Sequence, residues 1–269
     1  MLTLYCFGPG ANSLKPLLAL YEKGLDFKPH YLSAAKFEQH EEWYKKIHPN
    51  GQVPALDHDG KIITESTVIC EYLEDVFPNA NPLRPKDPYL AAQMRIWTKW
   101  VDEYFCWCVS TIGWELGVSR IARSVSDEEF EKLVARVPLY EQKVKWRNAR
   151  NGFDKKVLDE EYRKVDFSIK KLEARLAESN WLAGPDYTLA DICNFAIANG
   201  MQRGFSQYVN EKATPHLLDW MARINERPAC KKMFENAPRP LPPPDPKAAA
   251  AAAASKARGL DRRRHPSTS

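Results

Sequence analysis

Two serines in the first third of the chain stand where predicted helices begin, and both could bind an anion. Ser13 ends the turn-rich loop 8–13 after the first predicted strand, and Ser66 follows Glu65 at the start of another predicted helix. A helix N-terminus carries unsatisfied N–H groups and a positive partial charge, which suit a carboxylate. Glu65 could meet a ligand's ammonium group beside it. Each serine could instead simply cap its helix, a role that contributes about 1 kcal/mol.

The cysteines do not form a pattern that would bind a metal ion. Cys106 and Cys108 are two positions apart in a predicted helix, so their side chains point about 200° apart and cannot share one ion. Cys6, Cys70 and Cys193 lie within apolar runs, and we expect them in the core. We predict no metal site, and 6 cysteines among 269 residues fit a reducing cytoplasm.

Tryptophans recur along a helix predicted from residue 89 to about 114. Trp100, Trp107 and Trp114 are seven residues apart and therefore lie along one flank of this helix. The neighbouring face, which we expect to lie in the core, carries Trp97, Val101, Tyr104, Cys108 and Ile112. The three tryptophans could wall a pocket for a two-ring substrate, or they could pack against neighbouring helices.

The elements that must position these residues begin with alternating strands and helices. The predicted strands are 2–7, 27–32, 53–56 and 61–64, and the predicted helices are 15–23, 37–47 and 66–77. The first strand–helix–strand unit implies two parallel strands joined by a right-handed crossover. The turn at 57–60 adds an antiparallel hairpin. The resulting order, β-α-β-α-β-β-α, is that of a thioredoxin-like α/β domain.

A proline-rich linker separates this domain from a helical one. Residues 78–88 include four prolines, which cannot donate a main-chain hydrogen bond and disfavour helix in the residue before them. From 89 to 235 the pattern is helical throughout, with a capping box at Thr188 and Asp191. The Pro/Ala-rich basic segment 236–269 offers little to bury, so we expect it to be disordered. The predicted organisation is therefore a thioredoxin-like domain (1–77), a linker (78–88), an all-α domain (89–235) and a tail.

Charge and hydropathy argue against several classes of function. No run of 18 apolar residues is present, so we expect no membrane span. The net charge of +4 is concentrated in residues 247–269, which carry +5 and leave −1 for the rest. Nucleic-acid binding needs a basic face on the fold itself, so we expect none.

Six sequence stretches, together with this domain order, resemble the glutathione S-transferase superfamily from residue 1 to about 235. They are residues 7–16, 36–40, 51–56, 64–77, 97–114 and 190–200. In these stretches, above all in the tryptophan-rich run 97–114, the sequence resembles one branch of the superfamily. This branch is the bacterial β-etherases, which cleave β-aryl ethers of lignin. Within that branch the resemblance is to the S-selective enzymes.

The resemblance implies a glutathione S-transferase fold with glutathione as co-substrate. In the family the proline that matches Pro54 is cis, so the backbone of Val53 would pair with the cysteinyl part of glutathione. Without a ligand, Pro54 would be an ordinary edge-strand proline. Glu65 and Ser66 would bind the γ-glutamyl group. The glycyl end and the peptide groups would contact Gln39, His40 and Gln52.

Ser13 and Asn12 occupy the family's thiol-activating position. A free thiol titrates near 8.5, and a hydroxyl donor at a helix N-terminus lowers that pKa. Two alternatives remain: either residue merely caps the helix, or Asn12 and main-chain N–H groups stabilise the thiolate unaided. The absence of a cysteine here favours conjugation or substitution chemistry. For the second substrate, the family match favours contacts with Tyr104, Trp107 and Trp114.

The resemblance thus implies a glutathione-dependent β-etherase. The glutathione thiolate would displace the aryloxy group from the carbon next to a ketone, giving a glutathione thioether and a phenol. Two alternatives stay open: a general detoxifying glutathione transferase for other electrophiles, or a non-catalytic binding module with the same fold. We expect a cytoplasmic homodimer that binds a small aromatic ether and has no metal, nucleic-acid or membrane partner.

Overall fold

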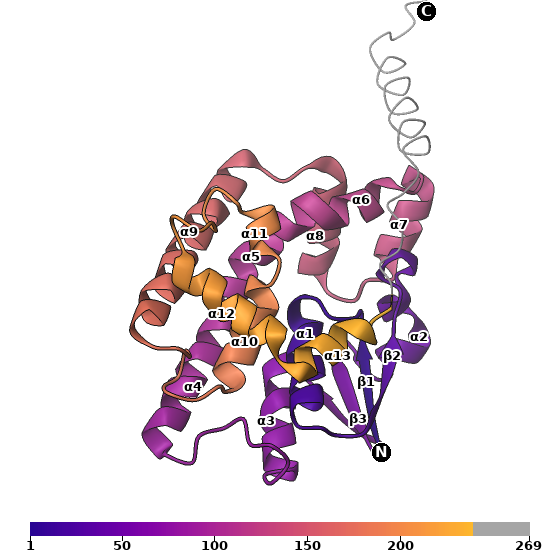
Figure 1. Ribbon diagram of the computed structural model, residues 1–269. Helices are drawn as coiled ribbons and strands as arrows, with labels where there is room; N and C mark the ends of the chain where they lie inside the picture. The colour runs from indigo at the N-terminus through magenta and orange to yellow at the C-terminus, as the bar shows by residue number, and fades with distance from the viewer. Residues whose placement is uncertain (239–269) are drawn as a thin grey trace, which may run out of the picture. The chain divides into compact units, whose positions relative to one another are not determined.

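The computed structural model describes residues 1–238 of the chain (Figure 1). Their contacts define a larger unit, Met1–Gly113 with Asp154–Pro238, and a smaller unit that contains Trp114–Phe153. We predict a disordered tail at 236–269. Most of it, residues 239–269, lies outside the described range.

The larger unit contains a sheet of four strands among the described residues, in the order β2-β1-β3-β4. The strands are β1 (Leu2–Cys6), β2 (Phe27–Tyr31), β3 (Ala55–His58) and β4 (Lys61–Thr64). β1 and β2 are parallel, whereas β3 is antiparallel to both β1 and β4. Asp59 and Gly60 turn the hairpin with positive φ values of 52° and 82°, as a two-residue turn with matching twist requires. The predicted thioredoxin-like order is confirmed.

Two helices flank this sheet and one prediction needs correction. α1 (Ala11–Glu22) and α3 (Ser66–Val76) are continuous helices, and α1 begins four residues before its predicted start. The helix predicted over 37–47 is wrong in its first half. Two 3₁₀ turns, Ala34–Lys36 and Glu38–His40, precede a short α2 (Glu42–Lys45), because Phe37 adopts a left-handed backbone, φ 55°, between the turns.

The remaining described elements are helical, and the predicted linker 78–88 lies between α3 and α4. The larger unit continues with α4 (Pro88–Trp100), η3 (Val101–Phe105), α5 (Cys106–Gly113), α9 (Lys155–Glu178), α10 (Leu189–Ala198), α11 (Met201–Gly204), α12 (Pro215–Glu226) and α13 (Pro228–Glu235). The smaller unit contains η4 (Trp114–Val118), α6 (Ser119–Arg123), α7 (Asp127–Ala135) and α8 (Tyr140–Asn151). None of the described helices is both long and apolar enough to cross a membrane.

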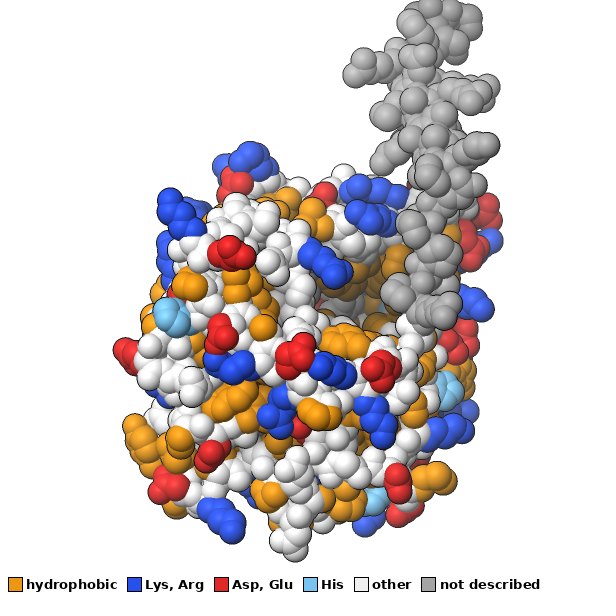
Figure 2. Space-filling model, viewed as in Figure 1, with side chains coloured by type: hydrophobic (Ala, Val, Ile, Leu, Met, Phe, Trp, Pro, Cys, Tyr) orange, Lys and Arg blue, Asp and Glu red, His pale blue; other side chains and the backbone are white. Residues whose placement is uncertain are grey.

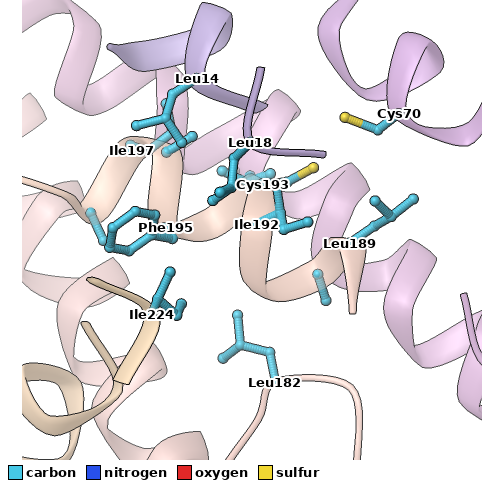
Figure 3. Packing of buried hydrophobic residues seen from close by; sticks show 14 of the residues in the cluster. Leu14, Leu18, Cys70, Leu182, Leu189, Ile192, Cys193, Phe195, Ile197 and Ile224 are labelled. Carbon is cyan, nitrogen blue, oxygen red and sulfur yellow. The ribbon is translucent and has the colours of Figure 1, made fainter. Parts of the chain in front are cut away.

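The core of the larger unit is shared by the sheet domain and the helices that follow it. Figure 3 shows Leu14 and Leu18 of α1 against Ile192, Cys193 and Ile197 of α10, all of them buried. Each fully buried leucine of this kind contributes about 1.5–3 kcal/mol of hydrophobic free energy. The cysteines predicted in the core, Cys6, Cys70 and Cys193, are indeed buried.

A π-helical turn, η3, changes which residues of the tryptophan-rich helix face that core. The Cys106 N–H donates to the carbonyl of Val101, five residues earlier, so this turn holds one residue more than an α-helical turn. Phe105 is fully buried and Tyr104 is half-buried. The prediction that Tyr104 faces the core is therefore wrong, and the next residue, Phe105, occupies that place.

The predicted capping box at the start of α10 is confirmed. The hydroxyl of Thr188 accepts from the Ala190 N–H at 3.2 Å, and the carboxylate of Asp191 accepts from the Thr188 N–H at 3.0 Å. This carboxylate also accepts from the Leu182 N–H and from Nε1 of Trp220, each at 3.0 Å. Burial raises the pKa of Asp191 to about 6 in spite of these donors. Asp191 therefore joins α10, α12 and the preceding loop through one buried group.

Surface charges in the larger unit form local pairs rather than a field of one sign. Figure 2 shows acidic and basic side chains interspersed over α12 and α13. Arg223 pairs with Asp219, and Lys231 pairs with Glu226 at 2.5 Å. This surface offers no basic stripe of the kind that a nucleic-acid backbone requires.

Candidate functional site

The sheet register brings the predicted site segments to one edge of the sheet. Tyr5, near the end of β1, pairs with Ala55, and Ala55 pairs with Thr64 at the end of β4. The β1–α1 loop, the loop before β3 and the start of α3 therefore meet at the same end of adjacent strands. Residues more than fifty positions apart in sequence are neighbours for this reason.

The loop before β3 contains a cis peptide bond between Val53 and Pro54. The buried Tyr44 anchors this loop by donating from its hydroxyl to the carbonyl of Gln52 at 2.7 Å. The ladder of β3 begins at Ala55, so the backbone of Val53 lies just beyond it. An extended peptide can add to a backbone segment placed in this way.

The start of α3 differs from the expectation that Ser66 caps the helix. Glu65 occupies the cap position and Ser66 is the first helical residue; among the described side chains, none caps this end. Glu65 is exposed and has a positive φ of 67°, an uncommon conformation for a residue other than glycine. Such backbone strain costs about 1–3 kcal/mol and clusters at ligand sites. Ser66, in contrast, is buried.

Gln39 and His40 lie beneath the loop before β3, which contains Gly51 and the cis-proline. Both are buried, and Gly51, with a φ of +60°, packs directly on them. A Cβ atom at Gly51 would lie 2.5 Å from Nδ1 of His40 and 2.8 Å from the carbonyl oxygen of Gln39. Oε1 of Gln39 is buried without a hydrogen-bond partner among residues 1–238, so it can accept a bond from a ligand.

His48 is a residue of this region that sequence reasoning missed. It is buried, and its Nδ1 has no hydrogen-bond partner within the described part of the chain. Burial lowers the pKa of His48, while the nearby charge of Glu65 acts in the opposite direction. Its place between α2 and the cis-proline loop was the only sequence signal, and that signal does not distinguish it from a solvated histidine.

The β1–α1 loop places Ser13 and Asn12 inside the first turn of α1, so neither residue caps this helix. Gly10 occupies the cap position, and no described side chain caps this end. The buried Ser13 hydroxyl accepts weakly from the Phe7 N–H at 3.4 Å, and its own proton can be donated. Oδ1 of Asn12 lies 3.5 Å from Sγ of Cys106, which acts as the donor.

The aromatic residues predicted for a second substrate have different surroundings. The Tyr104 ring stacks on Trp100 at a centroid distance of 6.5 Å and meets Phe167 edge-on at 6.0 Å. Trp107 is 58% exposed on α5. Trp114 belongs to the smaller unit, where its ring lies 4.9 Å from that of Trp146. Trp100 and Trp114 therefore have aromatic packing partners, and Trp107 presents more than half of its surface to solvent.

Two further kinds of site to consider are a surface depression and a metal site. An open surface depression of about 550 Å³ in the larger unit is lined by Asp159, Tyr162, Arg163, Gln207 and Tyr208, none of which is a predicted site residue. Within residues 1–238, no three His, Cys, Asp or Glu side chains are grouped as metal ligands.

Two family models match the chain. The model of the glutathione S-transferase N-terminal domain matches residues 1–75, and that of the C-terminal domain matches residues 105–228. The first match contains every predicted glutathione-site residue.

Individual relatives cover most of the chain. Protein LigF from Sphingobium sp. is 62% identical over an alignment of 243 residues, which covers 88% of this chain and 95% of that protein. A crystal structure of beta-etherase LigF from Sphingobium sp. has a TM-score of 0.86 and 63% identity, and covers 87% of this chain and 98% of that one. The structure of a glutathione transferase homologue from Sulfitobacter with bound glutathione has a TM-score of 0.62 and 26% identity, covering 87% and 97%.

Proposed function

The chain belongs to the glutathione S-transferase family, and we propose that it is a glutathione-dependent β-etherase. The observation that carries this proposal is the 62% identity with LigF, described in its crystal structure as a beta-etherase, over 88% of this chain. The substrate would be a lignin-derived β-aryl ether with a ketone next to the ether-bearing carbon. The S enantiomer is the proposed substrate, because the six matching stretches together resemble the S-selective enzymes of that branch.

Glutathione is a peptide with charged ends, and the site at the sheet edge suits such a ligand. The backbone of Val53 pairs with the cysteinyl residue, as an added strand would. The N–H groups at the start of α3, with Ser66, bind the γ-glutamyl carboxylate, and Glu65 binds the neighbouring ammonium group. The buried acceptor Oε1 of Gln39 supports a contact with an N–H of the ligand.

Two more predicted residues complete the proposed glutathione site. Gln52 and His40 face the peptide and glycyl parts of the ligand in this proposal. His40 is buried under Gly51, so it acts through the shape of the loop as much as through its ring. The charge of Glu65 also acts on the pKa of the buried His48, which we add as a residue of this region.

The reaction needs a thiolate at the start of α1. The Ser13 hydroxyl donates to the glutathione sulfur, and the amide of Asn12 and main-chain N–H groups add to this stabilisation. Hydrogen bonds to the charged form lower the pKa of the thiol, so more of it is ionised at neutral pH. The sulfur then attacks the ether-bearing carbon, the carbon–oxygen bond breaks, and the phenolate leaves with both bonding electrons and takes a proton from solvent.

The main contribution of the protein to the rate is to position the two substrates relative to each other. Holding the thiolate in line with the breaking bond replaces an encounter in solution by a step within one complex. We propose that Tyr104 and Trp107 of the larger unit contact the aromatic rings of the ether. The exposed indole of Trp107 supports this, since an aromatic face binds another ring well.

We also propose that two copies of the chain form a homodimer in the cytoplasm. Large apolar side chains are exposed on consecutive elements of the larger unit: Ile62 on β4, Val68 on α3 and Ile96 on α4. All six cysteines lie within the described residues and form no disulfide there, which fits a reducing compartment. Light scattering on a size-exclusion column measures the mass; a monomer at micromolar concentration contradicts the dimer.

One incubation tests the proposed activity. The protein is mixed with glutathione and a racemic β-aryl ether ketone, and both the phenol and the remaining ether are separated on a chiral column. We expect phenol equal to half of the ether, with the R enantiomer left. Turnover of halogenated electrophiles without phenol release indicates a general detoxifying transferase. Retention on immobilised glutathione without any turnover indicates a binding module.

A further inference from the structure

A fully buried lysine lies on the helix that carries the proposed thiolate-stabilising residues. Lys15 follows Ser13 by two residues on α1, and its side chain has no exposed surface. Its Nζ lies 2.5 Å from Oδ1 of Asp102. An unpaired ammonium group in such a place would be very costly, so Asp102 is the partner that makes this burial possible.

The same carboxylate holds a second element of the site. The hydroxyl of Thr67 donates to Oδ2 of Asp102, the oxygen that Lys15 does not use. Thr67 is the second residue of α3 and directly follows Ser66. One side chain of the helical region thus fixes the start of α1 with one oxygen and the start of α3 with the other.

The π-helical turn η3 is the backbone feature that presents this carboxylate. Asp102 lies within η3, between the buried Val101 and the buried Phe105. Its side chain is 34% exposed, so it stands at the border of the core and not inside it. π-Helical turns occur frequently at functional sites, where the extra residue redirects a side chain.

We propose that Asp102, with Lys15 and Thr67, is a positioning group for the glutathione reaction. This inference rests on the proposed function, in which the start of α3 binds the γ-glutamyl group and the start of α1 stabilises the thiolate. Both ends of one ligand are then held by elements whose separation Asp102 sets. A misplacement of about 1 Å between such anchors can reduce a rate about a hundredfold.

A second buried lysine–carboxylate pair provides a matched control. Lys23, at the end of α1, lies 2.5 Å from Glu74 of α3, and both side chains are buried. This pair joins the same two helices at their other ends. Replacing it removes a comparable buried interaction without touching the starts of α1 and α3.

The test compares variants of the full chain by calorimetric titration with glutathione alone, by kinetics with the ether, and by the ultraviolet absorbance of the bound thiolate against pH. Thr67→Val removes only the hydroxyl. We expect a KM for glutathione raised about fivefold to tenfold and a higher pKa of the bound thiol, with rescue by Thr67→Ser. Asp102→Asn is expected to raise KM at least about tenfold, and adding Thr67→Val to it should have little further effect.

The control separates positioning from stability. Lys23→Met with Glu74→Gln should lower the melting temperature and leave both KM and the thiol pKa within about twofold of the parent. If Thr67→Val and Asp102→Asn change only the melting temperature, the group is structural and the inference is wrong. If the parent protein binds no glutathione in the titration, the proposed function itself fails, which is a different result.

Discussion

Replacing Gly51 with alanine should weaken glutathione binding in addition to lowering stability. The backbone at Gly51 has a φ of +60°, and a Cβ atom there would lie 2.8 Å from the carbonyl oxygen of Gln39 and 2.5 Å from Nδ1 of His40. Heavy atoms do not stay this close, so the backbone at Gln39 must move by several tenths of an ångström. Gln39 and His40 are proposed glutathione contacts, and the displacement is transmitted to them directly.

The effect of Gly51→Ala has two parts, the cost of a left-handed backbone and the displacement of Gln39. A second glycine, Gly24, allows the two to be measured separately. Gly24 has nearly the same backbone, φ +64°, but no described atom lies within 4 Å of a Cβ placed there. Left-handed backbone costs an alanine about 1–2 kcal/mol at either position. A loss of that size lowers the melting temperature by about 2–8 °C. The displacement at Gln39 is added only in Gly51→Ala, where we expect KM for glutathione to rise about tenfold, equivalent to about 1.4 kcal/mol.

The assay is a pair of measurements on both variants. Steady-state kinetics with varied glutathione gives KM and kcat, and thermal unfolding gives the stability loss. We expect Gly24→Ala to keep the parental KM, and Gly51→Ala to raise KM with a smaller change in kcat, because the lost contact binds glutathione before and during the reaction. Equal KM values for the two variants would refute the contact between the loop at 39–40 and glutathione.

Three further predictions concern single side chains. Ser13→Ala should lower kcat about tenfold or less, because Asn12 and main-chain N–H groups still stabilise the thiolate; a loss of several orders of magnitude in stopped-flow turnover would contradict this. Glu65→Gln should raise KM for glutathione with little change in kcat, and an unchanged KM would remove Glu65 from the site. Burial raises the pKa of Asp191 to about 6, above its unfolded value of about 3.8, so the unfolded chain releases this proton first as the pH rises. The stability of the parent relative to Asp191→Asn should therefore fall by up to about 3 kcal/mol between pH 4 and pH 6 in urea unfolding, and a pH-independent difference would contradict the raised pKa.

The sequence alone determined the features that depend on nearby residues. Alternating strand and helix patterns predicted the thioredoxin-like order, which the sheet register confirms. The capping box at Thr188 and Asp191 could also be predicted from the sequence, because both of its hydrogen bonds join residues at most three positions apart. Burial of Cys6 and Cys193 followed from the apolar runs around them.

Only the tertiary structure decided how the site is held. Gly10 and Glu65 occupy the cap positions in place of the serines, and the π-helical turn exchanges Tyr104 for Phe105 in the core. Lys15 reads as a solvated lysine in any window of the sequence, yet it is fully buried because Asp102 lies 87 positions away in the chain and 2.5 Å away in space. A local pattern reports the preferences of its own few residues. The free energy of a buried charge depends on its partner, and that partner is supplied by the packing of distant helices.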